Sequence, residues 1–171
     1  MKKLLTLLLI IMTLFFSAQA NAQIESNKIL IDSTGFTLNN EKIELPIEIE
    51  NLEKHFGEPN RIIKLKNDIA VWDNIGIIGY MENNSDTVNA LNISLKLGKF
   101  DFSPENVYKG VIKIDSTLIS DTTSFQDLKN NRFIVNPYSD RIWDLEIGKL
   151  LLISMLDEDL KSLIEIMIEN N

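Results

Sequence analysis

An α+β fold is the expectation for this 171-residue chain, with a mainly antiparallel sheet and short helices on one face. Most of the chain alternates apolar and polar residues in short segments, which is typical of strands buried on one face. Residues 49–56 differ, because their apolar side chains recur three and four positions apart, as on one side of a short helix. The same order of elements then recurs, so we expect two pseudo-repeated halves.

The first 22 residues predict a signal peptide. Two lysines precede an apolar run at residues 4–16, and Ala20 and Ala22 are small residues of the kind that a signal peptidase recognises, so we expect cleavage before Gln23. The apolar run is shorter than the roughly 20 residues that a membrane-spanning helix needs. We therefore expect a periplasmic or secreted protein, with no stable membrane insertion after cleavage.

The charge balance excludes several kinds of partner. The chain has 17 Lys and Arg against 25 Asp and Glu, a formal net charge of −8, and the predicted leader removes two lysines and no acid. Such an acidic protein is repelled by phosphate, which disfavours nucleic acids and anionic membrane surfaces. The chain contains no cysteine, so an exported product has to fold without disulfides.

The first half, residues 23–99, predicts strands on both sides of the helix. The pair Asn39-Asn40 fits the turn of a hairpin because asparagine tolerates positive φ, and Gly57 followed by Pro59 ends the helix. The expected strands are residues 28–32, 36–38, 42–45, 61–65, 69–73, 76–81 and 88–97.

The second half, residues 100–171, repeats short patterns of the first in the same order. Residues 29–34 (ILIDST) recur as residues 112–117 (IKIDST), and residues 71–73 (VWD) recur as residues 142–144 (IWD). This shared order predicts an ancient duplication; the alternative is that the chain reuses common strand patterns. The other proposed counterparts are Ile49 and Leu52 with Phe125 and Leu128, Gly76 with Gly148, and Ile93 and Leu95 with Ile166 and Ile168.

One segment, residues 160–168, fits either a helix or a strand. Its leucines and methionine follow helical spacing after an acidic start, whereas Ile164, Ile166 and Ile168 alternate and are β-branched. We predict a strand, because this segment then matches the closing strand of the first half.

Two motifs of the first half carry a resemblance to a known family. The pattern LxxxFGEP at residues 52–59 is followed by VWDxxGI at residues 71–77. This order resembles an uncharacterised domain of bacterial secreted or toxin-neighbourhood proteins. It is more remotely similar to the small periplasmic modules of outer-membrane assembly lipoproteins and β-lactamase inhibitor proteins, the latter also a tandem of two similar halves. The resemblance covers residues 28–97 and implies a protein-binding or accessory role without catalysis; it assigns no functional residue.

The residue types that usually build a catalytic or metal centre are scarce. Zinc takes three or four Cys, His or carboxylate ligands, and the chain has a single histidine, His55. No Gly-x-Ser-x-Gly elbow presents a nucleophile, and no Gly-x-Gly-x-x-Gly loop cradles a phosphate. We predict no catalytic residue, no cofactor and no metal, and we expect His55 to lie in the last turn of its helix.

The two tryptophans are the side chains that the sequence singles out. Each ring buries a large area, so the first expectation is a pair of matched anchors in the core. The alternative is that a tryptophan is exposed and binds another protein, with a tyrosine beside it. The aspartate after each tryptophan is expected to start a turn. The residues of the predicted protein contact are Trp72, Tyr80, Tyr138 and Trp143.

These features predict an exported, non-catalytic protein that binds another protein, and this class includes inhibitors and immunity proteins. Its acidic surface would attract a basic partner at long range. Two alternatives stay open. One is a carboxylate-dependent hydrolase acting on cell-wall or polysaccharide material, since any two of the 25 acids could converge in space. The other is a structural module without a specific ligand.

Overall fold

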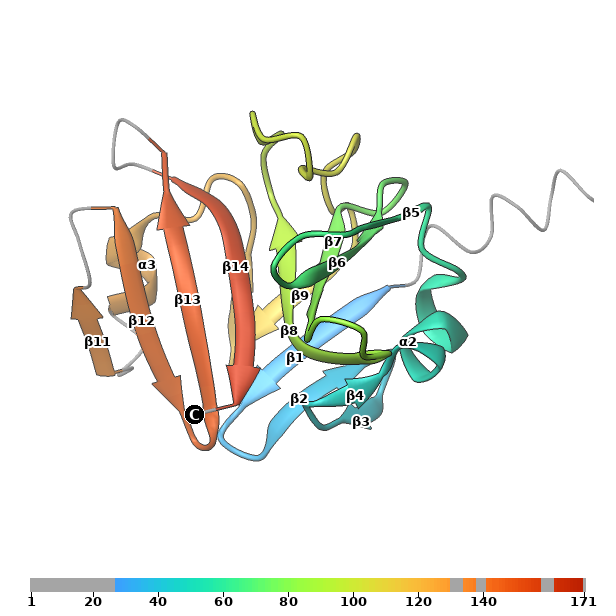
Figure 1. Ribbon diagram of the computed structural model, residues 1–171. Coiled ribbons are helices and arrows are strands. Elements are labelled where there is room, and N and C mark those ends of the chain that lie inside the picture. Colours follow the sequence, from blue (N-terminus) through green and yellow to red (C-terminus); the bar gives the residue numbers. More distant parts are fainter. Residues whose placement is uncertain (1–26, 130–133, 138–140, 158–161, 171) are drawn as a thin grey trace, which may run out of the picture.

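The strands form two sheets in the computed structural model, which describes residues 27–129, 134–137, 141–157 and 162–170 (Figure 1). The small sheet has the order β10-β9-β1-β2-β3, and the large sheet has the order β11-β12-β13-β14-β8-β7-β6-β5, with β4 paired to β8. The elements of the fold, in chain order, are β1 (Lys28–Asp32), β2 (Gly35–Leu38), β3 (Glu41–Ile43), β4 (Ile47–Glu48), α2 (Ile49–Phe56), β5 (Arg61–Ile63), β6 (Asp68–Trp72), β7 (Ile77–Met81), β8 (Thr87–Ser94), β9 (Val111–Ile114), β10 (Thr117–Ile119), α3 (Phe125–Lys129), β11 (Ile134–Pro137), β12 (Ile142–Ile147), β13 (Leu150–Leu156) and β14 (Leu163–Asn170).

Two hairpins meet at the centre of the small sheet. Strand β1 pairs in parallel with β9, which places Ile29 beside Ile112, and each strand pairs on its other side with its own antiparallel neighbour, β2 or β10. The turn between β2 and β3 has positive φ at Asn39 (54°) and Asn40 (69°), as expected from the sequence. The small sheet therefore contains strands from both predicted halves.

The large sheet consists of two antiparallel meanders side by side (Figure 1). Strands β5 to β8 form the first meander and β11 to β14 form the second. They meet where β8 pairs antiparallel with β14, with Ile93 opposite Ile166. The order hairpin, helix, meander occurs twice along the chain, and this is the order that a duplication requires. The duplication itself stays a prediction, as does the boundary between residues 99 and 100.

One hydrophobic core fills the space between the two sheets. Phe36 of the small sheet belongs to the same buried cluster as Ile93 and Ile166 of the large sheet, and each is exposed by 1% or less. The helices add Leu52 from α2 and Leu128 from α3, also exposed by 1% or less. We call the side of the large sheet that faces this core the inner face, and the opposite side the outer face.

The predicted α+β class, with helices covering one face of a sheet, is wrong. The described residues contain two helices, of eight and five residues, and the small sheet covers the face that helices were expected to cover. Helix α2 has the predicted bounds, and the last segment is a strand, β14, as predicted. Alternation shows that a strand has a buried face, but it does not show whether a helix or another sheet covers that face. The fold is therefore β-rich, with two sheets around one core.

The Trp-Asp segment of the first half closes the β6–β7 hairpin tightly. The N–H of Gly76 donates to the Trp72 carbonyl oxygen at 3.0 Å, and Gly76 has a φ of 74°. The indole N–H of Trp72 donates to the Gly57 carbonyl oxygen at 2.7 Å, and its ring meets the Phe56 ring edge-on at 5.6 Å. The residue after α2 and the end of β6 are thus joined by one buried side chain.

The segment that connects the two halves, residues 95–110, covers part of the outer face of the first meander. Phe102 packs against a small cluster made of Ile69, Val71 and Ile78. The Phe102 ring also stacks on the Phe100 ring, with 5.3 Å between their centroids. As a result, the three cluster residues are buried although they point away from the main core.

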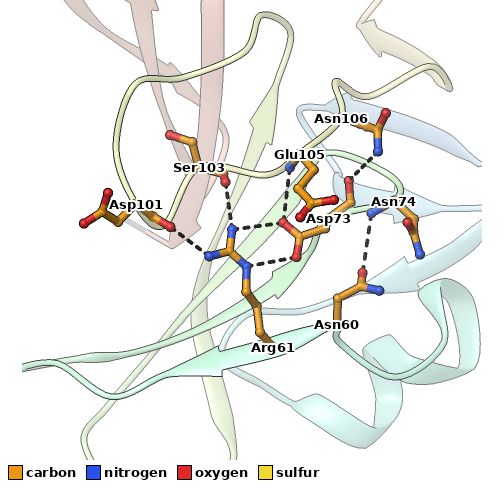
Figure 2. Close-up of polar contacts among 8 residues, drawn as sticks. All are labelled: Asn60, Arg61, Asp73, Asn74, Asp101, Ser103, Glu105 and Asn106. Atoms are coloured by element: carbon orange, nitrogen blue, oxygen red, sulfur yellow. Dashed lines mark hydrogen bonds and ion pairs between the residues drawn. The ribbon is translucent and has the colours of Figure 1, made fainter.

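A partly buried ion pair holds this connecting segment in place (Figure 2). Nε and Nη2 of Arg61 donate to the carboxylate of Asp73 at 2.9 and 3.0 Å. The same guanidinium donates to the carbonyl oxygens of Asp101 and Ser103 at 2.7 and 2.8 Å, and the N–H of Glu105 donates to Asp73 Oδ1 at 3.1 Å. The hydrogen bond to Asp73 is the main reason that the pKa of Arg61 is raised. One arginine thus joins β5, the β6–β7 turn and the connecting segment.

Replacing Arg61 by alanine should destabilise the fold by about 2 kcal/mol, because it leaves the carboxylate of Asp73 buried without its cation. The free energy of unfolding in urea measures this. Lys42→Ala is the matched control: it removes the cation of an exposed pair with Glu44, and this loss should change the stability much less because water screens both charges. Equal losses for the two variants would contradict the structural role of the Arg61 pair.

Replacing Gly76 by alanine should cost about 3 kcal/mol or more. A Cβ at this position would lie 2.3 Å from the Tyr108 nitrogen and 2.5 Å from the Val107 carbonyl carbon, so the connecting segment would have to move. Gly57→Ala is the control, because Gly57 has nearly the same φ (75°) but no atom within 4 Å of its Cβ position. That change should cost only the backbone strain at φ 75° and ψ −179°, about 1 to 3 kcal/mol, whereas Gly76→Ala adds the steric clash to the strain of its own positive φ. Thermal unfolding of both variants would show the difference, and similar melting temperatures would refute it.

Candidate protein-contact surface

The outer face of the large sheet is covered in its first half and open in its second half. In the first meander, outward residues such as Val71 and Ile78 lie beneath Phe102 and are exposed by 0% and 2%. In the second meander, α3 lies behind the strands in the view of Figure 1, and no described helix or strand crosses in front of β12 and β13. The outward side chains there are only half-buried.

Strand β13 presents an unbroken row of apolar side chains on this open face. Burial alternates along the strand: Leu150, Leu152, Ser154 and Leu156 are buried, and the residues between them are half-buried. We call the three half-buried outward residues, Leu151, Ile153 and Met155, the β13 row. Pairing places Met167 of β14 beside Ile153 and Ile142 of β12 beside Met155, so the apolar area extends to both neighbouring strands.

Carboxylates lie along both sides of the β13 row. Leu151 is paired with Glu146 on one side and with Glu169 on the other, and Met155 is paired with Glu165. Ile153 is paired with Asp144 of β12. We call Asp144, Glu146, Glu165 and Glu169 the acidic flanks. No lysine or arginine occupies an outward position of β8, β12, β13 or β14 within the described residues, so the charged side chains at these outward positions are all acidic.

A polar group marks the border between the open and covered halves of the outer face. Asn92 of β8 donates from Nδ2 to Glu165 Oε2 of β14 at 2.9 Å. Tyr80 of β7 lies close to this pair, and burial raises its pKa, with a smaller contribution from the negative charge of Glu165. Tyr80 therefore stays a neutral phenol at neutral pH. Of the predicted contact residues that the structure describes, Tyr80 is the one that lies at the edge of the open face.

The other predicted contact residues lie elsewhere. Trp72 is 1% exposed and belongs to the core, where it bonds to the residue after α2. Trp143 is half-buried, packs against the same core and is paired with Ser154 on the inner face. Both tryptophans thus point inward, but Trp72 ends its strand and Trp143 lies near the start of β12. Tyr138 lies outside the described residues.

The aspartates that follow the tryptophans differ in role. Asp73 does follow β6 in the turn, but its side chain is occupied by Arg61 and by the connecting segment. The prediction that Asp144 starts a turn is wrong, because Asp144 lies inside β12 and is paired with Ile153. The Asp144 side chain lies on the open face, where its charge remains in contact with water.

The β13 row was not predicted from the sequence, although one signal for it exists. The segment LLLISML at residues 150–156 is apolar at both sets of alternate positions. A strand with one face in the core needs only every second residue to be apolar. Additional apolar residues on the other face indicate a second covered surface or a surface that binds a partner.

His55 and a small cavity also bear on the candidate chemistry. The described residues contain no group of three or more His, Cys, Asp or Glu residues that could hold a metal ion. His55, at the end of α2 as expected, lies 3.4 Å from Glu41 of β3. A cavity of about 20 Å³, which is room for a single water molecule, is lined by Asn27, Asn74, Ile75, Val107, Tyr108, Lys109 and Gly110, with no carboxylate among them.

Comparison with solved structures finds similar arrangements at low identity. One is an extracellular protein containing a SCP domain from Bacillus anthracis str. Ames, with a TM-score of 0.49 and 14% identity. Another is a cysteine-rich secretory protein from Staphylococcus aureus subsp. aureus Mu50, with a TM-score of 0.39 and 13% identity. Each alignment covers 74% of this chain and 44% of the other, so the chain spans less than half the length of either protein.

Two further searches gave no match. Among curated proteins, no sequence matches this chain. Within the part of the chain that the structure describes, no helix combines the length and the apolar character needed to cross a membrane.

A family model covers most of the chain up to α3. The model of a domain of unknown function, DUF7738, matches residues 28–129. The matched region contains the small sheet, the first meander and both described helices, and it ends before β11. This match confirms that the chain contains an uncharacterised domain. The predicted link to bacterial secreted or toxin-neighbourhood proteins, and the remoter similarity to outer-membrane assembly lipoproteins and β-lactamase inhibitor proteins, stay predictions. The chain belongs to the DUF7738 family.

Proposed function

We propose that the protein binds another protein through the open outer face of β12, β13 and β14. The supporting observation is the β13 row, three apolar side chains in line and half-exposed, with a carboxylate beside each of them. A contact surface with an apolar centre and a polar rim is typical of protein interfaces. Among the described residues, no segment covers this row. In the first meander, by contrast, Phe102 of the connecting segment covers the outward side chains.

The charge of the face specifies the partner. Among the described residues of β8, β12, β13 and β14, no outward cation accompanies the four carboxylates, and this favours a partner that carries lysine or arginine around an apolar patch. The overall net charge of −8 attracts such a partner over a distance and accelerates its approach at low ionic strength. The same charges repel other acidic proteins and anionic lipid surfaces, so they contribute to specificity as well as to rate.

The proposed role is that of an exported binding or accessory protein, which includes an inhibitor or immunity protein. Export is proposed from residues 1–22, which carry the basic, apolar and small-residue regions of a signal peptide. The hydrolase alternative has no comparable supporting observation. The acidic flanks lie on both sides of an apolar row on an open face, and the cavity near Tyr108 is lined by no carboxylate.

Site-specific photo-crosslinking tests the proposed surface. A benzoyl-phenylalanine placed at Ile153, in the β13 row, should crosslink one defined partner in an envelope extract at about 50 mM salt and much less at about 500 mM salt. The control carries the same group at Leu118, which is 60% exposed on β10 of the small sheet. The partner identified by mass spectrometry is then purified, and its affinity for the full chain is measured. Equal crosslinking from both positions would argue against a specific face.

Charge reversal on the flanks should weaken binding of that purified partner by about tenfold or more. The variant Glu146→Lys/Glu169→Lys reverses the two carboxylates on either side of Leu151. The matched control, Glu58→Lys/Glu82→Lys, changes the net charge equally at two exposed residues of the first half. Calorimetric titration at two salt concentrations compares them. If the control loses as much affinity as the flank variant, net charge and not this face governs the association.

A further inference from the structure

We propose that the part of the partner which binds the open face is an amphipathic α-helix with basic flanks, lying along β13. This inference rests on the proposed function, and it specifies the shape and chemistry of the bound element. It follows from the geometry of the β13 row and the acidic flanks, taken together with the dimensions of strands and helices.

The length of the row suits a short helix. Leu151, Ile153 and Met155 point outward at every second residue, so the row runs along the strand for roughly 13 Å at about 3.3 Å per residue. An α-helix rises about 1.5 Å per residue, so about nine residues, or two and a half turns, cover the row. Three apolar side chains at helical spacing, i, i+4 and i+7, present contacts over this length.

The width of the acidic flanks also suits a helix. The flanks belong to the strands on either side of β13, and neighbouring strands are about 4.8 Å apart, so the two lines of carboxylates are separated by roughly 10 Å. This is close to the diameter of a helix with its side chains. A helix with its apolar side on Ile153 would therefore direct lysines or arginines from its two sides towards Glu146 and Glu169.

An extended partner strand fits this face poorly. A strand gains its binding energy by hydrogen bonding to the free edge of a sheet, and the edges of the large sheet are β5 and β11. The backbone groups of β13 are already paired with β12 and β14 on both sides. What β13 offers to a partner is its side chains, which a helix contacts with one of its own apolar sides.

The composition of the row suits an apolar surface that adapts to its ligand. Met155 and Met167 are flexible and polarizable, and they stand beside the stiffer Ile153. Such a surface accepts leucine, isoleucine or phenylalanine from the helix. The absence of outward cations on these strands, within the described residues, disfavours helices with acidic flanks.

A synthetic peptide tests this inference with the full chain. The probe has about 14 residues, with leucines at helical spacing on one side, lysines on both flanks and blocked ends. We expect it to bind and to become helical on binding, as measured by calorimetry and circular dichroism. Two controls have the same composition in scrambled order, or glutamate in place of each lysine, and each should bind at least tenfold more weakly. Equal binding of the scrambled peptide would show attraction by charge alone and would overturn the inference.

Variants of the chain test whether the peptide binds at the β13 row. Ile153→Ser should weaken peptide binding at least tenfold, and Glu146→Lys/Glu169→Lys should do the same and reduce the salt dependence. Leu118→Ser, on the small sheet, should leave binding unchanged. Unfolding curves verify that each variant is folded. If Ile153→Ser does not fold, the charge variant alone provides the test. Full binding by the folded variants would overturn the inference.

The crosslinking described above separates this inference from the proposed function. If Ile153 crosslinks a partner whose captured residues lie in a basic amphipathic helix, both are supported. If the captured residues lie in a strand or a loop, the helix is refuted while the protein-binding function stands. If no partner is captured from this face and the peptide fails to bind, both are refuted.

Discussion

The antiparallel pairing of β8 with β14 is the contact on which the architecture depends. It joins the two meanders into one sheet and places Ile93 opposite Ile166. Without it, each meander would expose a free edge and would bury its apolar side chains against only part of the small sheet. With it, the core is continuous across both halves, and the outer face is continuous as well. The β13 row and the acidic flanks therefore lie on a sheet that the first meander extends and stabilises.

The two halves of the outer face differ because of one connecting segment. Arg61 and Asp73 fix that segment where Phe102 covers the first meander, and this completes a small second core around Val71. The second meander has no such cover among the described residues, so its outward apolar side chains remain available. The region matched by the family model ends at residue 129, before β11. The covered half thus belongs to the shared domain, and the open half lies beyond it.

The sequence predicted local structure well and tertiary arrangement poorly. Helix α2, the Asn39-Asn40 turn and the strand β14 follow from spacing, turn chemistry and β-branching, which act within a few residues. The stacking of two sheets was missed because alternation is the same whether a helix or a strand covers the buried face. The ion pair between Arg61 and Asp73 was missed because its partners are not neighbours in the sequence, and no local pattern marks them. The open face of β13 has one signal in the sequence: residues 150–156 are apolar at both sets of alternate positions.

The parallel pairing of β1 with β9 affects how the chain acquires its structure during synthesis. Strand β1 is made first, yet one of its edges finds its partner only when residues 111–114 have been added. Contacts between such distant segments slow folding, and an unpaired apolar edge can join with another chain in the meantime. A nascent chain that stops before this point therefore carries an aggregation-prone edge, which is a reason for it to be kept unfolded by a chaperone until the second half emerges.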